Sequence, residues 1–504
     1  MLFNSSAFLI FFPIVFIVYY IIPKRIRYIW LLLASYYFYA NWNFWYIFLL
    51  LGCTVVTYVT ARMIEHKERD ENVNGKRRIL ISCIILLLAV LGYFKYFDFF
   101  LLYLNKFISF LHLGQIDRKL YAALPVGISF YVLQALGYVF DVYKGKICAE
   151  KNFLRYALFV SFFPQLVAGP IERSKDLLTQ LKEPSRLSWH DFWKGLLLIL
   201  YGLFCKMVIA DRIAIIVDTV YDSPAYYSGM YIAYAAFLFS FQIYCDFYGY
   251  STIARGVALT FGIKLQDNFN APYYSRSIQE FWRRWHISLS SWFRDYLYIP
   301  LGGNRKGKVR KECNLLFVFS VSGLWHGASL SFIVWGFLNG IYQVIRNIYD
   351  LVKNRVCRTL MRLYPFMEPE RKEEKDTFSR RLFQRIAVFI LITVTWIFFA
   401  AGGTREALYL IKQMFSVCNW NIFFDGSIAY LCDGKEYTYI MFMGIGILML
   451  VDFFKYRNKD AAELVLQQGG AFKILCFVSL IVSIMLFGCY GEMYDTQQFI
   501  YFQF

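Results

Sequence analysis

Apolar runs of nearly membrane-spanning length recur along the whole chain of 504 residues, and they constrain the fold more than any other feature. A helix that crosses a bilayer needs about 20 predominantly apolar residues. The runs occupy residues 5–22, 28–61, 79–111, 121–140, 153–170, 192–217, 229–248, 314–345, 383–401, 437–454 and 473–489. Several are long enough for two passes, so we predict an all-α polytopic membrane protein with about 10–12 transmembrane helices. We therefore expect the lipid bilayer to be one of its partners.

The formal net charge of +18 comes from Lys and Arg that gather between the apolar runs. Such stretches occur at residues 24–27, 62–78, 305–311, 346–385 and 455–473. Cytoplasmic loops of membrane proteins carry an excess of Lys and Arg, and a basic face suits the anionic lipid there. We therefore assign these stretches to the cytoplasm, expect a multi-pass protein of the cell membrane, and exclude a nucleic-acid partner.

A long polar stretch at residues 346–385 divides the chain. It includes EPERKEEKDTFSRR and is predicted to be a basic cytoplasmic linker between a main body, 1–345, and a C-terminal membrane segment, 386–504. Counting spans outward from this linker places residues 402–436 outside the membrane and directs the C-terminus outward.

Two segments of the main body differ from ordinary spans. Residues 281–296 carry Trp and Tyr at helical spacing with Arg on the other sides, which predicts one amphipathic helix. We expect it near an interface or under a cap of other helices, with its aromatic side chains pointing inward. Residues 312–345 have basic loops on both sides but are too few for two full spans of about 20 residues. We expect two short or broken helices that reverse near Gly327, where small residues let backbones approach closely.

Two of the five histidines, His286 and His326, lie in or beside these segments. An ionisable side chain at membrane depth costs about 2.5–3.5 kcal/mol on insertion scales, and imidazole is well suited to proton transfer near neutral pH. The alternative for His326 is a packing residue bonded to a serine or a carbonyl. The alternative for His286 is an interfacial residue of the amphipathic helix. Position alone leaves these alternatives open beside catalysis.

Three other polar residues carry competing interpretations. Asp246 is an acid inside an apolar run, where a hydrogen bond between helices is the simplest role and a direct catalytic role is the alternative. Asn268 lies in a loop marked by proline and is expected to hold a backbone turn. Tyr501, in the terminal FIYFQF, belongs either to an aromatic interface tag or to a temporary acyl carrier, because a phenyl ester is more activated than an alkyl ester.

Other chemistries lack their sequence patterns. The eleven cysteines are scattered singly, without a C-x-x-C pair or a Cys/His cluster of zinc spacing, so we expect no metal. No serine sits in a G-x-S-x-G elbow. No internal repeat is visible, which weakens a transporter interpretation without excluding it.

Several long strings resemble, in order, those of the membrane-bound O-acyltransferases. They are PVGISFYVLQALGYVFDVYKG (125–145), FFPQLVAGPIERSKDLLTQL (162–181), DNFNAPYYSRSIQEFWRRWHISLSSWFRDYLYIPLGGNR (267–305) and SGLWHGAS (322–329). The chain is most similar to the alginate O-acetylase branch, including its ending in FIYFQF. Two positions depart from the family pattern: Asn339 replaces a histidine, and Thr252 replaces the aspartate of GYSD.

This resemblance implies a family fold in which membrane helices, with amphipathic and broken ones among them, surround a central tunnel. It implies that His326 and His286 form the active-site pair at the waist of this tunnel. It also implies that Tyr501 takes part in moving the acyl group. We expect acetyl-CoA or another cytoplasmic acyl carrier as the donor. Five residues are placed around the donor as lining or support: Arg283, Trp285, Trp325, Asp246 and Asn268.

The expected function is O-acetylation of an extracellular or cell-wall polysaccharide with an acyl group taken from a cytoplasmic thioester. His326 would be the general base, and His286 would orient the donor or stabilise developing negative charge. The expected protein partner is an extracellular O-acyltransferase of the SGNH type. The alternatives are a transporter or flippase of an acylated or lipid-linked intermediate, a D-alanyl transfer protein, and a scaffold that docks a secreted acyltransferase.

Overall fold

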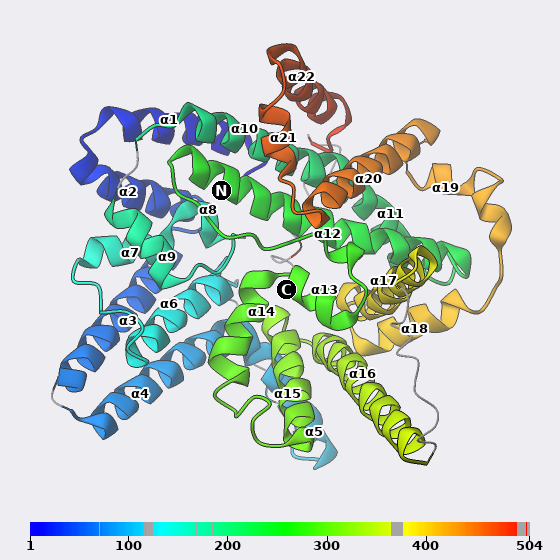
Figure 1. Ribbon diagram of the computed structural model, residues 1–504, viewed down its shortest axis with the longest axis horizontal. Coiled ribbons are helices and arrows are strands. Elements are labelled where there is room, and N and C mark those ends of the chain that lie inside the picture. Colours follow the sequence, from blue (N-terminus) through cyan, green and yellow to red (C-terminus); the bar gives the residue numbers. More distant parts are fainter. Residues whose placement is uncertain are drawn as a thin grey trace. The chain divides into compact units, whose positions relative to one another are not determined.

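The structure, a computed structural model, describes residues 1–69, 71–114, 116, 124–167, 169–183, 186–363, 376–432, 434–490 and 500. All regular secondary structure within these residues is helical, so the predicted all-α class is confirmed (Figure 1).

Six helices in the described part of the chain are long and apolar enough to cross a membrane. They cover Tyr46–Glu68, Val73–Phe110, Met230–Thr260, Phe378–Ala400, Lys435–Tyr456 and Gly470–Phe487. Shorter apolar helices, α1 (Ser6–Ile21) and α6 (Ile128–Tyr143), add to them. The multi-pass membrane class is therefore confirmed. The count of about 10–12 passes stays a prediction, because length alone does not decide whether a short or broken helix crosses.

The chain forms two compact units. The first unit contains Met1–Arg212, Ile243–Asn268 and Lys459–Phe504, and the second contains Ile213–Gln242 and Phe269–Asn458. The division predicted around the linker 346–385 concerns membrane topology and stays a prediction.

In the first unit, two helices pack so closely that only glycine fits between their backbones. Besides α1 and α6, this unit contains η1 (Lys24–Ile26), α2 (Arg27–Ala40), α3 (Tyr46–Arg69), α4 (Val73–Leu91), η2 (Gly92–Tyr96), α5 (Phe97–Phe110), α7 (Phe153–Ser161), α8 (Phe163–Leu166), α9 (Ser174–Lys182), α10 (Trp189–Leu203), the π-helix η3 (Phe204–Ala210), the later part of α12 (Met230–Thr260), α21 (Ala461–Leu466) and α22 (Gly470–Phe487). Gly195 and Gly202 on α10 face Gly256 and Gly249 on α12, and a Cβ on any of them would collide with the opposing backbone. This approach brings the start of η3 against the middle of α12.

The second unit contains a helical hairpin that reverses where the sequence predicted. Its helices are most of α11 (Asp211–Asp222), the start of α12, η4 (Pro272–Tyr274), α13 (Ile278–Arg284), α14 (Ile287–Phe293), η5 (Arg294–Tyr298), α15 (Lys308–His326), α16 (Leu330–Leu363), α17 (Phe378–Ala400), α18 (Thr404–Met414), η6 (Trp420–Phe423), α19 (Ser427–Tyr430) and α20 (Lys435–Tyr456). Because α15 ends at His326 and α16 begins at Leu330, the reversal near Gly327 is confirmed. The expectation that both helices are short or broken is wrong for α16, which continues without a break over 34 residues to Leu363. Gly323 and Gly336 lie where a Cβ would overlap the backbone of the opposite helix.

The prediction of one amphipathic helix over residues 281–296 is wrong. The chain forms α13 and α14 instead, separated at Trp285 and His286. His286 has a left-handed backbone with φ of 43°, which interrupts a right-handed helix. The break turns Trp285 inward, where its ring lies 5.4 Å from Phe281 and 5.0 Å from Phe269. This indole is buried among aromatic rings, which agrees with the expected alternative of aromatic side chains that point inward under other helices.

Candidate active site

His326 is the last residue of α15, and its ring lies in a shell of aromatic side chains. The helix ends there because Gly327 is extended, with φ of −159° and ψ of 153°. Only 3% of His326 is exposed. The ring centroids of Trp325, Trp335 and Phe399 lie 5.0, 5.0 and 5.4 Å from that of His326. These edge-to-face contacts restrict the orientation of the imidazole.

His286 occupies the break between α13 and α14 and is 1% exposed. A left-handed backbone is unfavourable for a residue with a side chain, and such strain concentrates at functional sites. The carbonyl of His286 accepts the N–H of Ser290 at 3.0 Å and so begins α14. Burial lowers the pKa of His286 to about 3, because apolar surroundings do not solvate an imidazolium. The ring is therefore neutral near pH 7.

The two imidazoles lie close together. Their centroids are 6.3 Å apart, with an angle of 66° between the ring planes. Trp325 lies beside both rings, with its centroid 6.1 Å from that of His286. The structure thus brings together the two histidines that the sequence singled out, at the end of one helix and at the break of another.

The shell also contains residues that the sequence did not single out. Trp335 and Trp396 are each 1% exposed, and their rings stack at 5.5 Å. Within the described residues, neither indole N–H has a hydrogen-bond partner. A buried N–H without a partner is rare in proteins. In the sequence both tryptophans look like ordinary residues of apolar helices, so their proximity to His326 could not be recognised there.

Asn339, where the family pattern has histidine, holds this shell together. Its side chain is fully buried and accepts the indole N–H of Trp282 at 3.3 Å. Its amide donates to the carbonyl of Trp335 at 2.9 Å. Asn339 therefore links α13 to α16, and the rings of Trp282 and Trp335 lie 5.6 Å apart.

The residues predicted to line or support the donor site lie in different surroundings. Trp325 lies beside both histidines. Trp285 joins the same shell through Trp396, whose ring lies 5.0 Å away. Arg283 is exposed and makes no polar contact with another described residue. The structure therefore places the two tryptophans, and not the arginine, around the histidines.

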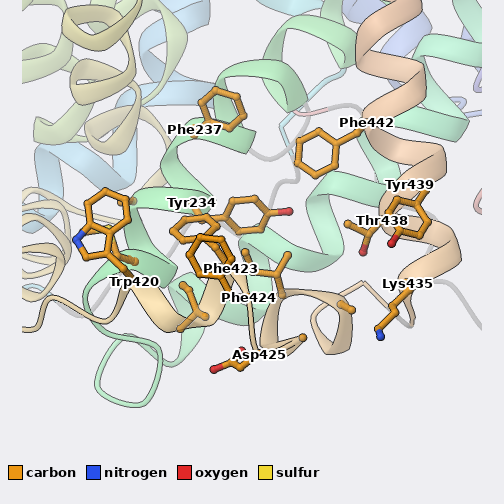
Figure 2. A pocket seen from close by; sticks show the side chains of 16 residues that line it. Tyr234, Phe237, Trp420, Phe423, Phe424, Asp425, Lys435, Thr438, Tyr439 and Phe442 are labelled. Atoms are coloured by element: carbon orange, nitrogen blue, oxygen red, sulfur yellow. The ribbon is translucent and has the colours of Figure 1, made fainter.

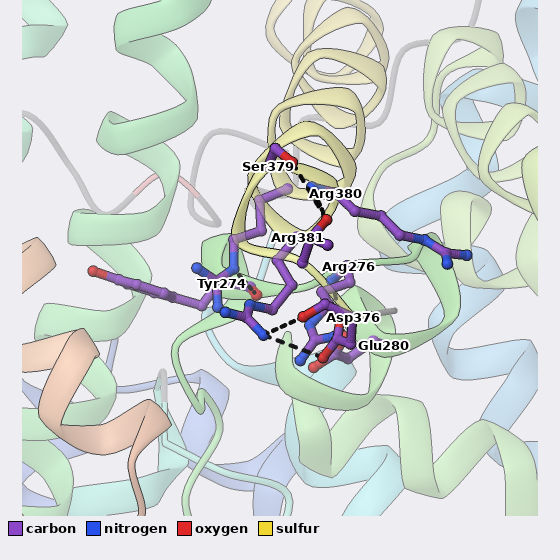
Figure 3. A network of polar contacts seen from close by, with 9 residues as sticks. Tyr274, Arg276, Glu280, Asp376, Ser379, Arg380 and Arg381 are labelled. Carbon is purple, nitrogen blue, oxygen red and sulfur yellow. Dashed lines mark hydrogen bonds and ion pairs between the residues drawn. The ribbon is translucent and has the colours of Figure 1, made fainter. Parts of the chain in front are cut away.

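An ion-pair network fixes the beginnings of α13 and α17. Arg276, just before α13, contacts Asp376, just before α17, at 2.9 Å (Figure 3). Arg381 contacts the same carboxylate at 3.4 Å. The carboxylate of Glu280 accepts the backbone N–H of Arg276 at 2.9 Å. These bonds hold α17, which carries Trp396 further along, against the segment that leads to His286.

Asp246 belongs to the first unit and is 3% exposed in the middle of α12. Its Oδ1 lies 2.6 Å from Nζ of Lys206, and the same Nζ lies 2.7 Å from Oδ1 of Asp211. Its Oδ2 accepts the backbone N–H of Ile500 at 2.7 Å. Asp246 thus connects helices, as the simplest interpretation expected, and it also contacts the end of the chain. Tyr501 lies outside the described residues.

Two members of this ion triad were missed in the sequence. Lys206 and Asp211 lie within the apolar run 192–217, where any charge is costly, and that cost is the signal that could have revealed them. Asn268, also in the first unit, is 1% exposed. The predicted contribution of Asp246 and Asn268 to a donor site stays a prediction.

A separate cavity of about 760 Å³ lies in the second unit, among the start of α12, the segment from η6 to α19 and the start of α20 (Figure 2). Aromatic side chains dominate its lining, among them Tyr234, Phe237, Trp420, Phe423, Phe424, Tyr439 and Phe442. Neither histidine lines it, so it is not part of the candidate active site. Among the described residues, no group of three His, Cys, Asp or Glu side chains could hold a metal ion.

The chain is similar to a family of membrane enzymes and to several known proteins. The model of the membrane-bound O-acyltransferase family matches residues 149–400, half of the chain. A peptidoglycan O-acetyltransferase of Helicobacter pylori is 36% identical over 82% of this chain and 80% of its own. A probable alginate O-acetylase of Pseudomonas syringae is 34% identical over 94% of this chain and 86% of its own. A teichoic acid D-alanyltransferase of Bacillus subtilis is 27% identical over 45% of this chain and 59% of its own.

The matched residues include both histidines, the hairpin of α15 and α16, and the aromatic shell around His326. With its relatives and its helical membrane architecture, this match shows that the chain is an acyltransferase and belongs to the membrane-bound O-acyltransferase family.

Proposed function

We propose that this protein takes an acetyl group from acetyl-CoA at the cytoplasmic face of the cell membrane and passes it outward for O-acetylation of a polysaccharide. The names of the relatives support a polysaccharide acceptor, because they act on peptidoglycan or alginate. The observation that carries the proposal is the pair of buried imidazoles, 6.3 Å apart, inside an aromatic shell.

His326 serves as the general base in this mechanism. Its Nδ1 or Nε2 takes the proton of the attacking hydroxyl, whose oxygen then bonds to the thioester carbonyl carbon. The C–S bond breaks, and CoA leaves as a thiolate that takes up a proton. Proton transfer of this kind is worth about 10²–10⁴ in rate. Because the ring lies at the end of α15 among fixed aromatic rings, the base keeps one position during the reaction.

His286 and the indole N–H groups stabilise the negative charge that develops on the thioester oxygen. A neutral imidazole donates one hydrogen bond, and its rigid backbone position holds the donor in place. Trp335 and Trp396 carry buried N–H groups without a partner in the described structure, so a bound acyl donor could accept from them. The surrounding rings also exclude water, which protects the thioester from hydrolysis.

Tyr501 is the first acceptor in this proposal. Its phenol gives its proton to His326 and becomes an acetyl ester, which is activated for a second transfer. An extracellular O-acyltransferase of the SGNH type then moves the acetyl group from the phenol to a sugar hydroxyl. Tyr501 carries the only hydroxyl group of the terminal FIYFQF.

The test uses purified protein in lipid nanodiscs with acetyl-CoA labelled in the acetyl group. The wild type should release CoA and gain label on Tyr501. His326→Ala should lose both activities, whereas His66→Ala, a change of an exposed histidine on α3, should keep them. A folded His326→Ala protein with normal acetyl transfer would rule out the base assignment.

Two alternatives give different results in the same experiment. A transporter, flippase or docking scaffold would neither release CoA nor become labelled. A D-alanyl transfer protein would take up labelled D-alanine from a carrier protein instead of acetyl from CoA. The match to D-alanyltransferases is shorter and weaker than the match to O-acetyltransferases, so we favour acetyl.

A further inference from the structure

We infer that Asp246 is a positioning residue that clamps the C-terminal end of the chain in the interior of the first unit. The contact involves the backbone N–H of Ile500 and one carboxylate oxygen in the middle of α12. Its catalytic consequence, presentation of Tyr501 for acetylation, rests on the proposed function. The clamp itself does not.

The two carboxylate oxygens of Asp246 contact different groups. Oδ1 faces the ammonium of Lys206 at 2.6 Å, and Oδ2 accepts from Ile500 at 2.7 Å. A hydrogen bond to a carboxylate is about twice as strong as one between neutral groups. In a site from which water is excluded, this bond has little competition.

The charges of Lys206, Asp211 and Asp246 explain why this ion triad requires a hydrogen bond from Ile500. Lys206, Asp211 and Asp246 have side chains that are 2%, 7% and 4% exposed. Two carboxylates share one ammonium, so the second negative charge requires additional hydrogen-bond donors. The N–H of Ile500 is such a donor. The triad and the end of the chain therefore stabilise each other.

A second contact near η3 supports the clamp. The N–H of Cys489 donates to the carbonyl of Met207 at 3.0 Å, and Arg212 donates to the carbonyl of Phe487 at 3.2 Å. In contrast, α22 has no buried residue of its own. Of the described residues after α22, Cys489 therefore contacts η3 and Ile500 contacts α12. A π-helix such as η3 is rare and is frequently found at functional sites.

The experiment measures hydrogen exchange of the C-terminal peptide, residues 491–504, in nanodisc-embedded full-length protein. Ile500→Pro removes the donated N–H and leaves the triad intact, and Ile500→Val is its matched control. Asp246→Leu removes the acceptor but leaves Lys206 paired with Asp211. Asp211→Asn is the control for it, because the pair of Lys206 with Asp246 and the bond to Ile500 remain.

Exchange in this peptide should become at least about tenfold faster in Ile500→Pro and Asp246→Leu, and stay near the wild-type rate in both controls. Asp246→Asn should restore most of the protection, because its amide oxygen still accepts from Ile500. Unchanged exchange in Ile500→Pro would overturn the clamp, and so would an equal increase in Asp211→Asn. If Asp246→Leu does not fold, the comparison of Ile500→Pro with Ile500→Val still tests the clamp.

Acetyl labelling separates the clamp from the carrier role. If both hold, Ile500→Pro should slow labelling of Tyr501 about tenfold or more, while Ile500→Val labels normally. If Tyr501→Phe supports normal polysaccharide acetylation, the carrier role fails, and the exchange pattern still tests the clamp by itself.

Discussion

The shell around His326 and the triad around Lys206 are both buried and polar, but they accommodate polarity in opposite ways. In the shell, neutral rings are enclosed by aromatic side chains, and charge is excluded. In the triad, the ammonium of Lys206 lies 2.6 and 2.7 Å from the carboxylates of Asp246 and Asp211 and is paired with both. Matched charges hold a structure in place but cannot easily change their protonation. An imidazole in water takes up and releases a proton near neutral pH, whereas burial lowers the pKa of His286 to about 3 and keeps that ring neutral.

Replacing His326 tests this contrast most strongly. His326→Gln should lower the rate of acetyl transfer by about 10²–10⁴, because the base is lost, with only a small change in stability. Acetyl transfer is measured as CoA release, and folding as the elution profile and apparent Tm. A variant that unfolds instead would mean that the shell, like the triad, depends on its polar group for structure.

Removing the triad's only ammonium should give the opposite result. Lys206→Met leaves two buried carboxylates without a countercharge and should destabilise the fold by about 3–5 kcal/mol. Thermal unfolding in detergent measures the loss. Adding Asp211→Asn and Asp246→Asn to Lys206→Met removes all three charges and should recover most of it. A single variant as stable as the wild type would contradict the assigned role of the ion pairs.

A smaller effect is expected for the indole N–H in the shell. Trp335→Phe keeps an aromatic ring beside His326 but removes the unpartnered donor, so kcat should fall about tenfold with little change in KM. Trp189→Phe, which changes an exposed tryptophan, serves as the control. An equal loss in both variants, or a change in KM alone, would argue against a contact made in the transition state.

The smallest effect is expected for Glu172, a buried carboxyl group of the first unit. Glu172 accepts the N–H of Gln266 at 2.8 Å, and burial, with the neighbouring charge of Asp176, raises the pKa of Glu172 to about 8. The folded state therefore binds this proton more tightly than the unfolded state. The resulting stability is complete below about pH 4 and is lost as pH rises through 8.

Glu172→Gln should accordingly remove part of the loss of unfolding free energy between pH 6 and pH 9, about 1 kcal/mol or more. This change is measured as a smaller decrease in Tm. Glu183→Gln, at an exposed position, should leave that decrease unchanged. An identical pH profile in both variants would show that Glu172 is not the titrating group.

Much of the fold followed from residue patterns. The recurring apolar runs predicted helices, and the shortness of residues 312–345 predicted the hairpin at Gly327, because too few residues remain for two full spans. At residues 281–296, residue patterns predicted one helix, and this prediction was wrong. Helical spacing of Trp residues shows a preference for one face but not whether the backbone stays helical, and the left-handed turn at His286 depends on rings from other segments.

The assignment of the site residues stays a prediction, and the structure shows where most of them lie. His286 and His326 stood out because ionisable residues are costly near apolar segments. Trp335 and Trp396 did not, because a tryptophan in an apolar helix is ordinary. Arg283 was selected for its neighbours in sequence and proved to be exposed. The partners of Asp246 could not be chosen, since Lys206 and Ile500 are distant from it along the chain.

Amino-acid order alone determined that this chain is helical, crosses a membrane several times and carries two histidines in or beside apolar segments, because hydropathy and cost of burial are properties of short segments. Only the tertiary structure decided that these imidazoles meet within 6.3 Å and that one aspartate contacts the end of the chain. Those contacts join residues far apart in sequence, and their formation depends on glycine-mediated helix packing and on a backbone turn that no local pattern specifies.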